Sequence, residues 1–265
     1  MPAQSLGSEL RAIAEQLARS AGDMALIGRK SGDITATTKS SPTDMVTQYD
    51  KASEEMVTTG LRTLRPDDGV VGEEGASREG TSGITWHIDP IDGTSNFYFD
   101  IPMWAVSIGA VDEHGPIAGA VYAPALGDMF TASRGDGATL NDSPISVRSN
   151  PLLSDALVGT GFSYHADKRG AHARRVTQMI TQIRDIRRLG AAAIDLCFVA
   201  CGRYDAYFEE NLQSWDLVAG QIIATEAGAI VTDYSGNAVT PAQVLATQPG
   251  IQSALIHLIA ESSEK

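Results

Sequence analysis

The spacing of apolar residues changes along this chain, and that change limits the possible fold more than any other feature. Between Leu6 and Ile27 apolar side chains recur every three or four positions, as on one face of an amphipathic helix. A second helix is expected over residues 49–64, ending before Pro66. From Val70 onward the apolar residues come in short runs that are typical of strands. The chain therefore combines helices with sheets.

The rest of the sequence alternates short apolar runs with helical patterns. Strands are expected near residues 70–71, 84–88, 105–111, 117–122, 156–161, 186–189, 204–209 and 230–233. Helices are expected over residues 166–183, 191–201, 216–227 and 251–261. We predict an α/β protein in which helices are layered on sheets. Residues 1–150 and 151–265 would form two halves of one compact unit, with a soft boundary between them.

Composition excludes several classes of protein. The formal net charge of −13 argues against nucleic-acid binding, which depends on a basic surface. Even the apolar stretch Ala191–Ala200 is too short to span a membrane. Residues 1–9 lack the basic and apolar regions of a secretory signal, so we expect a cytoplasmic protein without membrane contact. Cys197 and Cys201 are expected to be core residues of a helix, with a metal pair as the remote alternative.

The densest chemical signal is the segment from Trp86 to Phe97. Asp89 and Asp92 follow an apolar strand, and a tight turn at Pro90 would point both carboxylates the same way, beside the Ile91 carbonyl. Such oxygen ligands suit Mg²⁺. The next residues, Gly93-Thr94-Ser95, can begin a helical turn whose free amides face an anion. The segment predicts adjoining metal and phosphate sites, against the plain alternative of an Asp-Pro turn with Thr94 as a helix cap.

Three other polar segments have both a functional and a plain structural interpretation. The acidic pair in Gly72-Glu73-Glu74-Gly75 lies at a strand end, where it could equally be a solvated loop. Asp216 precedes a helix and could serve only as its N-cap. The segment from Lys39 to Asp50 reads as a polar loop followed by a helix whose cap is Thr47 or Asp50.

Taken together, these segments resemble the inositol monophosphatase family, within a larger group of lithium-sensitive, metal-dependent sugar-phosphate phosphatases. The resemblance runs from Lys39-Ser40-Ser41-Pro42 to Glu226-Ala227-Gly228. Its most specific part is Asp89-Pro90-Ile91-Asp92-Gly93-Thr94, with Gly-Glu-Glu upstream and Trp-Asp downstream. It implies an alternating α-β-α-β-α sandwich of the inositol monophosphatase and fructose-bisphosphatase type, a homodimer and sensitivity to lithium.

The resemblance also implies a metal site for two or three Mg²⁺ ions. Glu73, Asp89 and the Ile91 carbonyl would bind the first ion. Asp89, Asp92 and Asp216 would bind the second, and Glu73 would help to hold a weaker third ion through water. Two such ions about 3.5–4 Å apart can activate a water and stabilise the leaving oxygen, without a covalent phosphoenzyme.

The resemblance assigns the catalytic and substrate-binding residues as well. Asp50 would hydrogen-bond Thr94, and Thr94 with Glu73 would orient the attacking water. The phosphate would rest on Gly93 and Thr94, and the hydroxyl groups of the alcohol would contact Ala192 and Glu209. The full substrate-binding set is then Asp92, Gly93, Thr94, Ala192, Glu209 and Asp216.

The substrate is the least constrained part of this interpretation. Glu209 and the Gly190-Ala191-Ala192 segment favour a small phosphorylated polyol, with inositol 1-phosphate first. Histidinol phosphate, fructose 1,6-bisphosphate and phosphoadenosine phosphates stay open as alternatives. A non-catalytic regulatory binding protein is the alternative from a different class.

Overall fold

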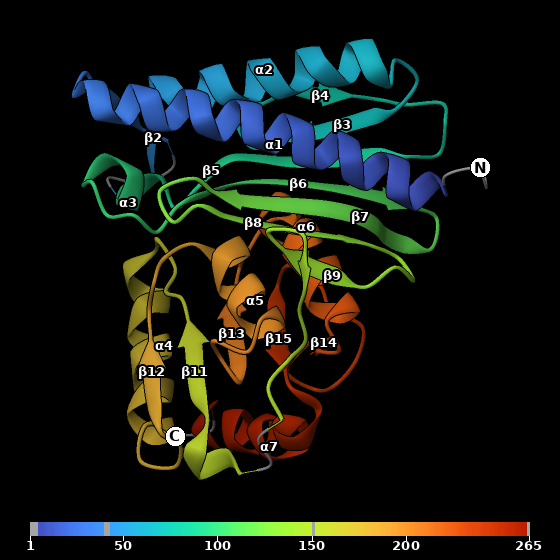
Figure 1. Ribbon diagram of the computed structural model, residues 1–265. Helices are drawn as coiled ribbons and strands as arrows, with labels where there is room; N and C mark the ends of the chain where they lie inside the picture. The colour runs from blue at the N-terminus through green and yellow to red at the C-terminus, as the bar shows by residue number, and fades with distance from the viewer. Residues whose placement is uncertain (1–4, 40–42, 150–151, 264–265) are drawn as a thin grey trace.

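The computed structural model describes residues 5–39, 43–149 and 152–263. Five layers alternate between helices and sheets (Figure 1). Helices α1 and α2 cover one face of an eight-stranded sheet, and helices α5 and α6 cover its other face. A five-stranded sheet follows, and α4 and α7 pack beyond it. This arrangement confirms the predicted α-β-α-β-α sandwich.

The first layer is built from the two amphipathic helices expected from the sequence, α1 (Leu6–Ser31) and α2 (Gln48–Leu64). Helix α1 ends at Gly32, whose φ of 80° gives the left-handed cap that glycine accepts without strain. The two helices are connected through a short antiparallel pair, β1 (Ala36–Thr38) and β2 (Met45–Thr47). The segment expected to be a polar loop before the second helix therefore contains strand β2, and residues 40–42 lie outside the described residues.

The larger sheet has the strand order β10-β9-β8-β7-β6-β5-β3-β4. All neighbours are antiparallel except β3 and β5, which run parallel. Its strands are β3 (Gly69–Gly72), β4 (Ser77–Arg78), β5 (Thr85–Asp92), β6 (Ala105–Asp112), β7 (Gly115–Ala123), β8 (Asp128–Ser133), β9 (Ala138–Leu140) and β10 (Ser143–Pro144). A short helix, α3 (Thr94–Tyr98), follows β5 directly.

The smaller sheet has the order β12-β11-β13-β15-β14, in which β11 is parallel to both of its neighbours. Its strands are β11 (Leu157–Thr160), β12 (Asp185–Arg187), β13 (Ala206–Glu210), β14 (Ile230–Thr232) and β15 (Gln243–Thr247). The helices of this half are α4 (Ala166–Met179), α5 (Ala192–Ala200), α6 (Ser214–Glu226) and α7 (Gln252–Ser263), with 3₁₀ turns at Leu153–Asp155 and Pro249–Ile251.

Glycines on the large sheet make room for the close approach of helix α6. A Cβ built on Gly109 of β6 would lie 2.7 Å from the Ala219 amide nitrogen of α6. A Cβ on Gly119 of β7 would lie 2.9 Å from the Ala219 Cα. The core around α5 and α6 draws buried residues from both sides of residue 150, for example Phe130 and Leu196. The division into halves stays a prediction, and residues 150–151 lie outside the described chain.

Several expected elements have different boundaries in the structure. Helix α4 ends at Met179 and not near residue 183, and strands β8, β9 and β15 were not expected at all. Cys197 is buried in the core and Cys201 is half-buried, as expected of core residues. No helix in the described residues is both long enough and apolar enough to cross a membrane.

Candidate metal and phosphate site

The two central carboxylates lie at the end of β5, and both are almost completely buried. Asp89 is 2% exposed and Asp92 is 6% exposed. The prediction of a tight turn at Pro90 is wrong, because β5 continues to Asp92. Its register against β6 is irregular between Asp89 and Asp92. The Ile91 amide donates to Asp89 Oδ1 at 3.0 Å across this bulge. A bulge re-aims side chains without ending the strand, so both aspartates reach the same side of the site.

Helix α3 begins at the residue after Gly93, which has φ 86°. A Cβ on Gly93 would also lie 2.9 Å from the Met103 carbonyl oxygen, so both conformation and space require glycine there. Thr94 is the first residue of the helix and Gly93 is its N-cap. The alternative in which Thr94 itself caps the helix is therefore wrong. The expected helical turn is present directly after the two aspartates.

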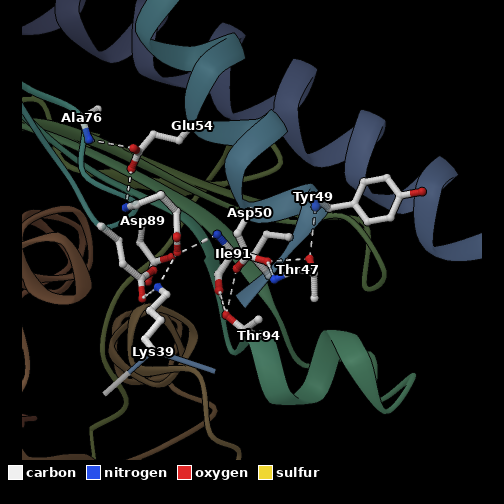
Figure 2. A network of polar contacts seen from close by, with 11 residues as sticks. Lys39, Thr47, Tyr49, Asp50, Glu54, Ala76, Asp89, Ile91 and Thr94 are labelled. Carbon is white, nitrogen blue, oxygen red and sulfur yellow. Dashed lines mark hydrogen bonds and ion pairs between the residues drawn. The ribbon is translucent and has the colours of Figure 1, made fainter. Parts of the chain in front are cut away.

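Thr94 is held by a buried aspartate of α2. Thr94 Oγ1 lies 3.0 Å from Asp50 Oδ1 and 3.0 Å from the Ile91 carbonyl oxygen, and Figure 2 shows both contacts. Thr47 is the N-cap of α2, and its amide donates to Asp50 Oδ2 at 2.8 Å in a capping box. Burial raises the pKa of Asp50 to about 6, against the effect of its hydrogen bonds from Thr47 and Thr94. Asp50 is therefore both a helix-capping residue and the acceptor for Thr94.

Glu73 follows β3 and faces a lysine. Lys39 Nζ donates to Glu73 Oε1 at 2.9 Å and also contacts Glu74 Oε1 (Figure 2). These carboxylates raise the pKa of Lys39 although burial opposes them. The acidic pair is therefore not a freely solvated loop, since its carboxylates hold a cation at the edge of the site.

Asp216 reaches the site from the first turn of α6. It is not the N-cap, because Gln213 occupies that position and Asp216 is the third helical residue. The Gln213 amide donates to Asp216 Oδ2 at 2.7 Å. Asp92 is held in a similar way by α5, where the amides of Ala192 and Ala193 donate to its two oxygens at 3.1 and 2.7 Å. The starts of α5 and α6 thus position one carboxylate each.

One pocket of about 740 Å³ brings the predicted residues together. Its wall contains nearly all of them: Glu73, Asp89, Ile91, Asp92, Gly93, Thr94, Ala192, Glu209 and Asp216. Asp50 lies behind Thr94 and is fully buried. The pocket also contains residues to which the sequence assigned no role: Lys39, Phe162, Tyr164, His165, Lys168 and Arg188. For Lys168 and Arg188 the available signal was the cluster of basic residues between them, in an otherwise acidic chain.

The carboxylates of this pocket raise one another's pKa values. Burial and then the charges of Glu73, Asp92 and Asp216 raise the pKa of Asp89 well above its usual range. Burial and Asp216 do the same for Asp92. Burial raises the pKa of Asp216 to about 6. Burial also raises the pKa of Glu73, against the Lys39 ammonium. Carboxylates crowded in this way are unfavourable as anions, and divalent ions would relieve their repulsion.

The donor set fits a hard metal ion. Carboxylates and a backbone carbonyl are the ligands that Mg²⁺ accepts, with water completing the octahedron. Within the chain that the structure describes, no three acidic, histidine or cysteine side chains form a ready-made metal-binding group. The oxygen chemistry of these ligands, and the burial of Asp89 and Asp92, support a metal site in this pocket.

The pocket wall also contains the two residues predicted to contact the alcohol, Ala192 and Glu209. Glu209 Oε2 accepts a hydrogen bond from the Tyr207 hydroxyl at 2.5 Å. Burial raises the pKa of Glu209, while the positive charge of Arg188 opposes that shift. A Cβ on Gly161, the residue directly after β11, would lie 1.8 Å from Glu209 Oε2, so only glycine at this position leaves room for the carboxylate. The amide of Ala192 is engaged with Asp92, although the residue also lines the pocket.

Comparison with known proteins agrees with the motif and its geometry. The sequence profile described as "Inositol monophosphatase family" matches residues 7–265. The chain belongs to the inositol monophosphatase family. It is a phosphatase of the inositol monophosphatase type, in a family that is generally metal-dependent.

Relatives of this inositol monophosphatase family member match over most of their length. Inositol-1-monophosphatase of Mycobacterium leprae (strain TN) is 39% identical over 268 residues, covering 94% of this chain and 92% of the relative. Nus factor SuhB of Pasteurella multocida (strain Pm70) is 38% identical over 251 residues, covering 93% and 94%. The crystal structure of the extragenic suppressor protein suhB from Bartonella henselae matches with a TM-score of 0.90 at 32% identity, covering 95% of this chain and 98% of that one.

Proposed function

We propose that this phosphatase hydrolyses a small phosphomonoester in a Mg²⁺-dependent reaction, with inositol 1-phosphate as the leading substrate. One observation carries the proposal: the buried carboxylates of Asp89 and Asp92 and the half-buried ones of Glu73 and Asp216, all with raised pKa values, lie beside a helical turn at Thr94 in one pocket. The carboxylates match a cation site, and the turn supplies amides for an anion. A relative 39% identical over almost the whole chain is an inositol-1-monophosphatase, which supports the choice of substrate.

The metal ligands in this proposal are Glu73, Asp89, the Ile91 carbonyl, Asp92 and Asp216. Two or three bound Mg²⁺ ions would supply positive charge for water activation and for the leaving oxygen. Asp92 and Asp216 remain oriented by the amides that hold them, from α5 and from Gln213. Helix termini therefore fix these two carboxylates before any ion arrives.

Thr94 and Glu73 orient the attacking water. When Thr94 Oγ1 donates its proton to Asp50 Oδ1, its lone pairs are free to accept a hydrogen bond from that water. The Glu73 carboxylate accepts a second hydrogen bond from the same water. The two hydrogen bonds align the water with the phosphorus atom. Gly93 and Thr94 bind the phosphate at the start of α3, beside Asp92 and Asp216. Glu209 accepts hydrogen bonds from hydroxyl groups of the alcohol, near Ala192.

A substrate panel tests the choice of alcohol. Phosphate release would be measured for inositol 1-phosphate, histidinol phosphate, fructose 1,6-bisphosphate and a phosphoadenosine phosphate, with and without Mg²⁺. We expect inositol 1-phosphate to have the highest kcat/KM, and Glu209→Gln to raise its KM more than it lowers kcat. Preference for another member would reject the assignment of Glu209 and Ala192 while keeping the metal site. Metal-independent release from every member would reject the proposed chemistry.

A binding role without catalysis is the second candidate, because several relatives are named Nus factor SuhB. The net charge of −13 argues against direct contact with nucleic acid. A cellular phenotype retained by an inactive Asp92→Asn protein would favour such a role. A homodimer, sensitivity to lithium and a cytoplasmic location stay predictions from the sequence.

A further inference from the structure

Helix α2 presents a short row of buried polar side chains to the site. Asp50, Ser53 and Glu54 are spaced three and four residues apart, so they share one face of the helix. They are 0%, 0% and 6% exposed. A helix face of this kind normally packs apolar residues, and each of these three instead hydrogen-bonds a segment of the proposed metal site.

Glu54 clamps the loop that carries Glu73. Its Oε2 accepts from the Glu74 amide and its Oε1 accepts from the Ala76 amide, each at 2.8 Å, as Figure 2 shows. The two amides lie on either side of Gly75, where the loop turns with φ 107°. A Cβ on Gly72 would lie 2.3 Å from Glu54 Oε2, so the sequence leaves space for this carboxylate.

Ser53 holds the bulge that carries Asp89. Its hydroxyl donates to the Pro90 carbonyl at 3.0 Å. Pro90 is buried and has no amide proton, and the register of β5 against β6 is broken between Asp89 and Asp92. A buried carbonyl at such a break needs a donor from outside the ladder, and Ser53 supplies it.

We infer that Ser53 and Glu54 are positioning residues for the metal site, and that α2 sets the relative places of the Glu73 loop and the Asp89 bulge. Neither residue is among the described residues that line the pocket, so each acts through the backbone that it holds. The inference rests on the proposed function, because it takes Glu73 and Asp89 as metal ligands. Ser53 and Glu54 hold the backbone next to these ligands, and such contacts orient ligands before an ion binds.

Glu54→Gln is the direct test, because it keeps the size of the side chain and replaces one acceptor oxygen by a donor that opposes an amide. Binding of Mn²⁺, followed by electron paramagnetic resonance of the free ion, gives a readout that does not need turnover. Mg²⁺ dependence and the KM of inositol 1-phosphate at saturating Mg²⁺ would be measured on the same proteins. We expect about 10-fold weaker Mn²⁺ binding and a similar rise in the Mg²⁺ requirement, with KM changed less than about twofold.

Two variants of the same helix are the controls. Glu55→Gln makes the identical substitution one residue along, at an exposed position, and should bind Mn²⁺ like the wild type. Val57→Ala removes buried methyl groups and measures what a loss of stability alone does to binding. Ser53→Ala should weaken Mn²⁺ binding about threefold, and it provides the test if Glu54→Gln does not fold.

Failure of the positioning role and failure of the proposed function give different results. Wild-type Mn²⁺ affinity in folded Glu54→Gln, or an equal loss in Val57→Ala, would overturn the positioning role. If Glu54→Gln does not fold, wild-type affinity in Ser53→Ala would overturn it. A wild-type protein that binds no Mn²⁺ and needs no Mg²⁺ would instead reject the proposed function.

Discussion

At the scale of single residues, every acidic side chain of the proposed metal site is held by a hydrogen bond or an ion pair. Asp89 and Asp92 could be predicted as a pair from the strand that precedes them. The bulge that aims them could not, because its register depends on β6 as the pairing strand. The contact between Asp92 and the amides of Ala192 and Ala193 joins residues about 100 positions apart, and the sequence carries no local sign of it.

The Thr94 hydroxyl gives a prediction at this scale. Thr94→Val keeps the shape of the side chain and removes the group that Asp50 orients. We expect kcat to fall by about 10²–10⁴-fold, the usual contribution of a positioned proton-handling group. Thr94→Ser should retain most of the activity, since it keeps the hydroxyl. Steady-state kinetics at saturating Mg²⁺ decides this, and nearly wild-type kcat in Thr94→Val would remove Thr94 from the mechanism.

Asp68 gives a prediction about stability and pH. This 1% exposed carboxylate accepts hydrogen bonds from Ser82 Oγ at 2.6 Å, from Trp86 Nε1 at 2.8 Å and from Arg65 Nε at 2.8 Å. Burial alone would raise the pKa of Asp68, but Arg65, Ser82 and Trp86 together lower it. Because the pKa of Asp68 is lower in the folded than in the unfolded protein, its carboxylate stabilises the fold fully above the unfolded-state pKa of about 4. This stabilisation is lost as the pH falls through the folded-state pKa.

The measurement is urea unfolding of the wild type and Asp68→Asn across pH 3–7. The variant should be less stable at pH 7 by about 3 kcal/mol, because Arg65 loses its buried partner. The difference should stay constant down to about pH 4.5 and shrink below it. A difference that grows on acidification would contradict the assigned direction of the pKa shift.

At the scale of elements, helical periodicity was the more reliable guide. The seven α-helices in the described residues all fall in segments where the sequence indicates a helix or helical turn. Strand β8 was missed because its sequence mixes polar and small residues, and Thr131 and Ser133 are buried only through tertiary contacts. The Thr131 hydroxyl lies 2.9 Å from that of Thr139 on β9, a cross-strand pair that no single strand reveals.

The glycine contact between β6 and α6 gives a prediction at the scale of elements. Gly109→Ala places a methyl group against the backbone of α6 at Ala219, so the helix must move and carry Asp216 with it. We expect a loss of about 1–3 kcal/mol in unfolding free energy and weaker Mn²⁺ binding. Gly170→Ala on α4 is the control, because its Cβ would meet only the Arg174 side chain at 3.7 Å. It should be neutral or stabilising by up to about 1 kcal/mol in urea unfolding. Equal stability of the two variants would contradict the packing argument.

At the scale of the whole molecule, the site lies where the layers meet. The large sheet supplies Asp89 and Asp92, α2 supplies Asp50, and the middle helices supply Ala192 and Asp216. Because these residues come from both halves of the chain, the site forms only when the halves are packed together.

The α/β class could be predicted from the alternating helix and strand patterns. The sandwich could be predicted from the family motif.

The shared core gives a prediction about cooperativity. Residues from both sides of position 150 form one buried cluster around α5 and α6. We expect a single calorimetric transition with equal calorimetric and van't Hoff enthalpies, because neither half can bury that cluster alone. Two transitions that separate by more than a few degrees would show that the halves fold independently.

The central claim is that Glu73, Asp89, Asp92 and Asp216 bind Mg²⁺ for phosphate-ester hydrolysis. It is tested most directly by phosphate release from inositol 1-phosphate over a Mg²⁺ titration, for the wild type, Asp92→Asn and the exposed control Asp67→Asn. We predict strict Mg²⁺ dependence in the wild type and the control, and a loss of at least about 10³-fold in Asp92→Asn. Wild-type turnover in a folded Asp92→Asn protein, or release that ignores Mg²⁺, would contradict the claim.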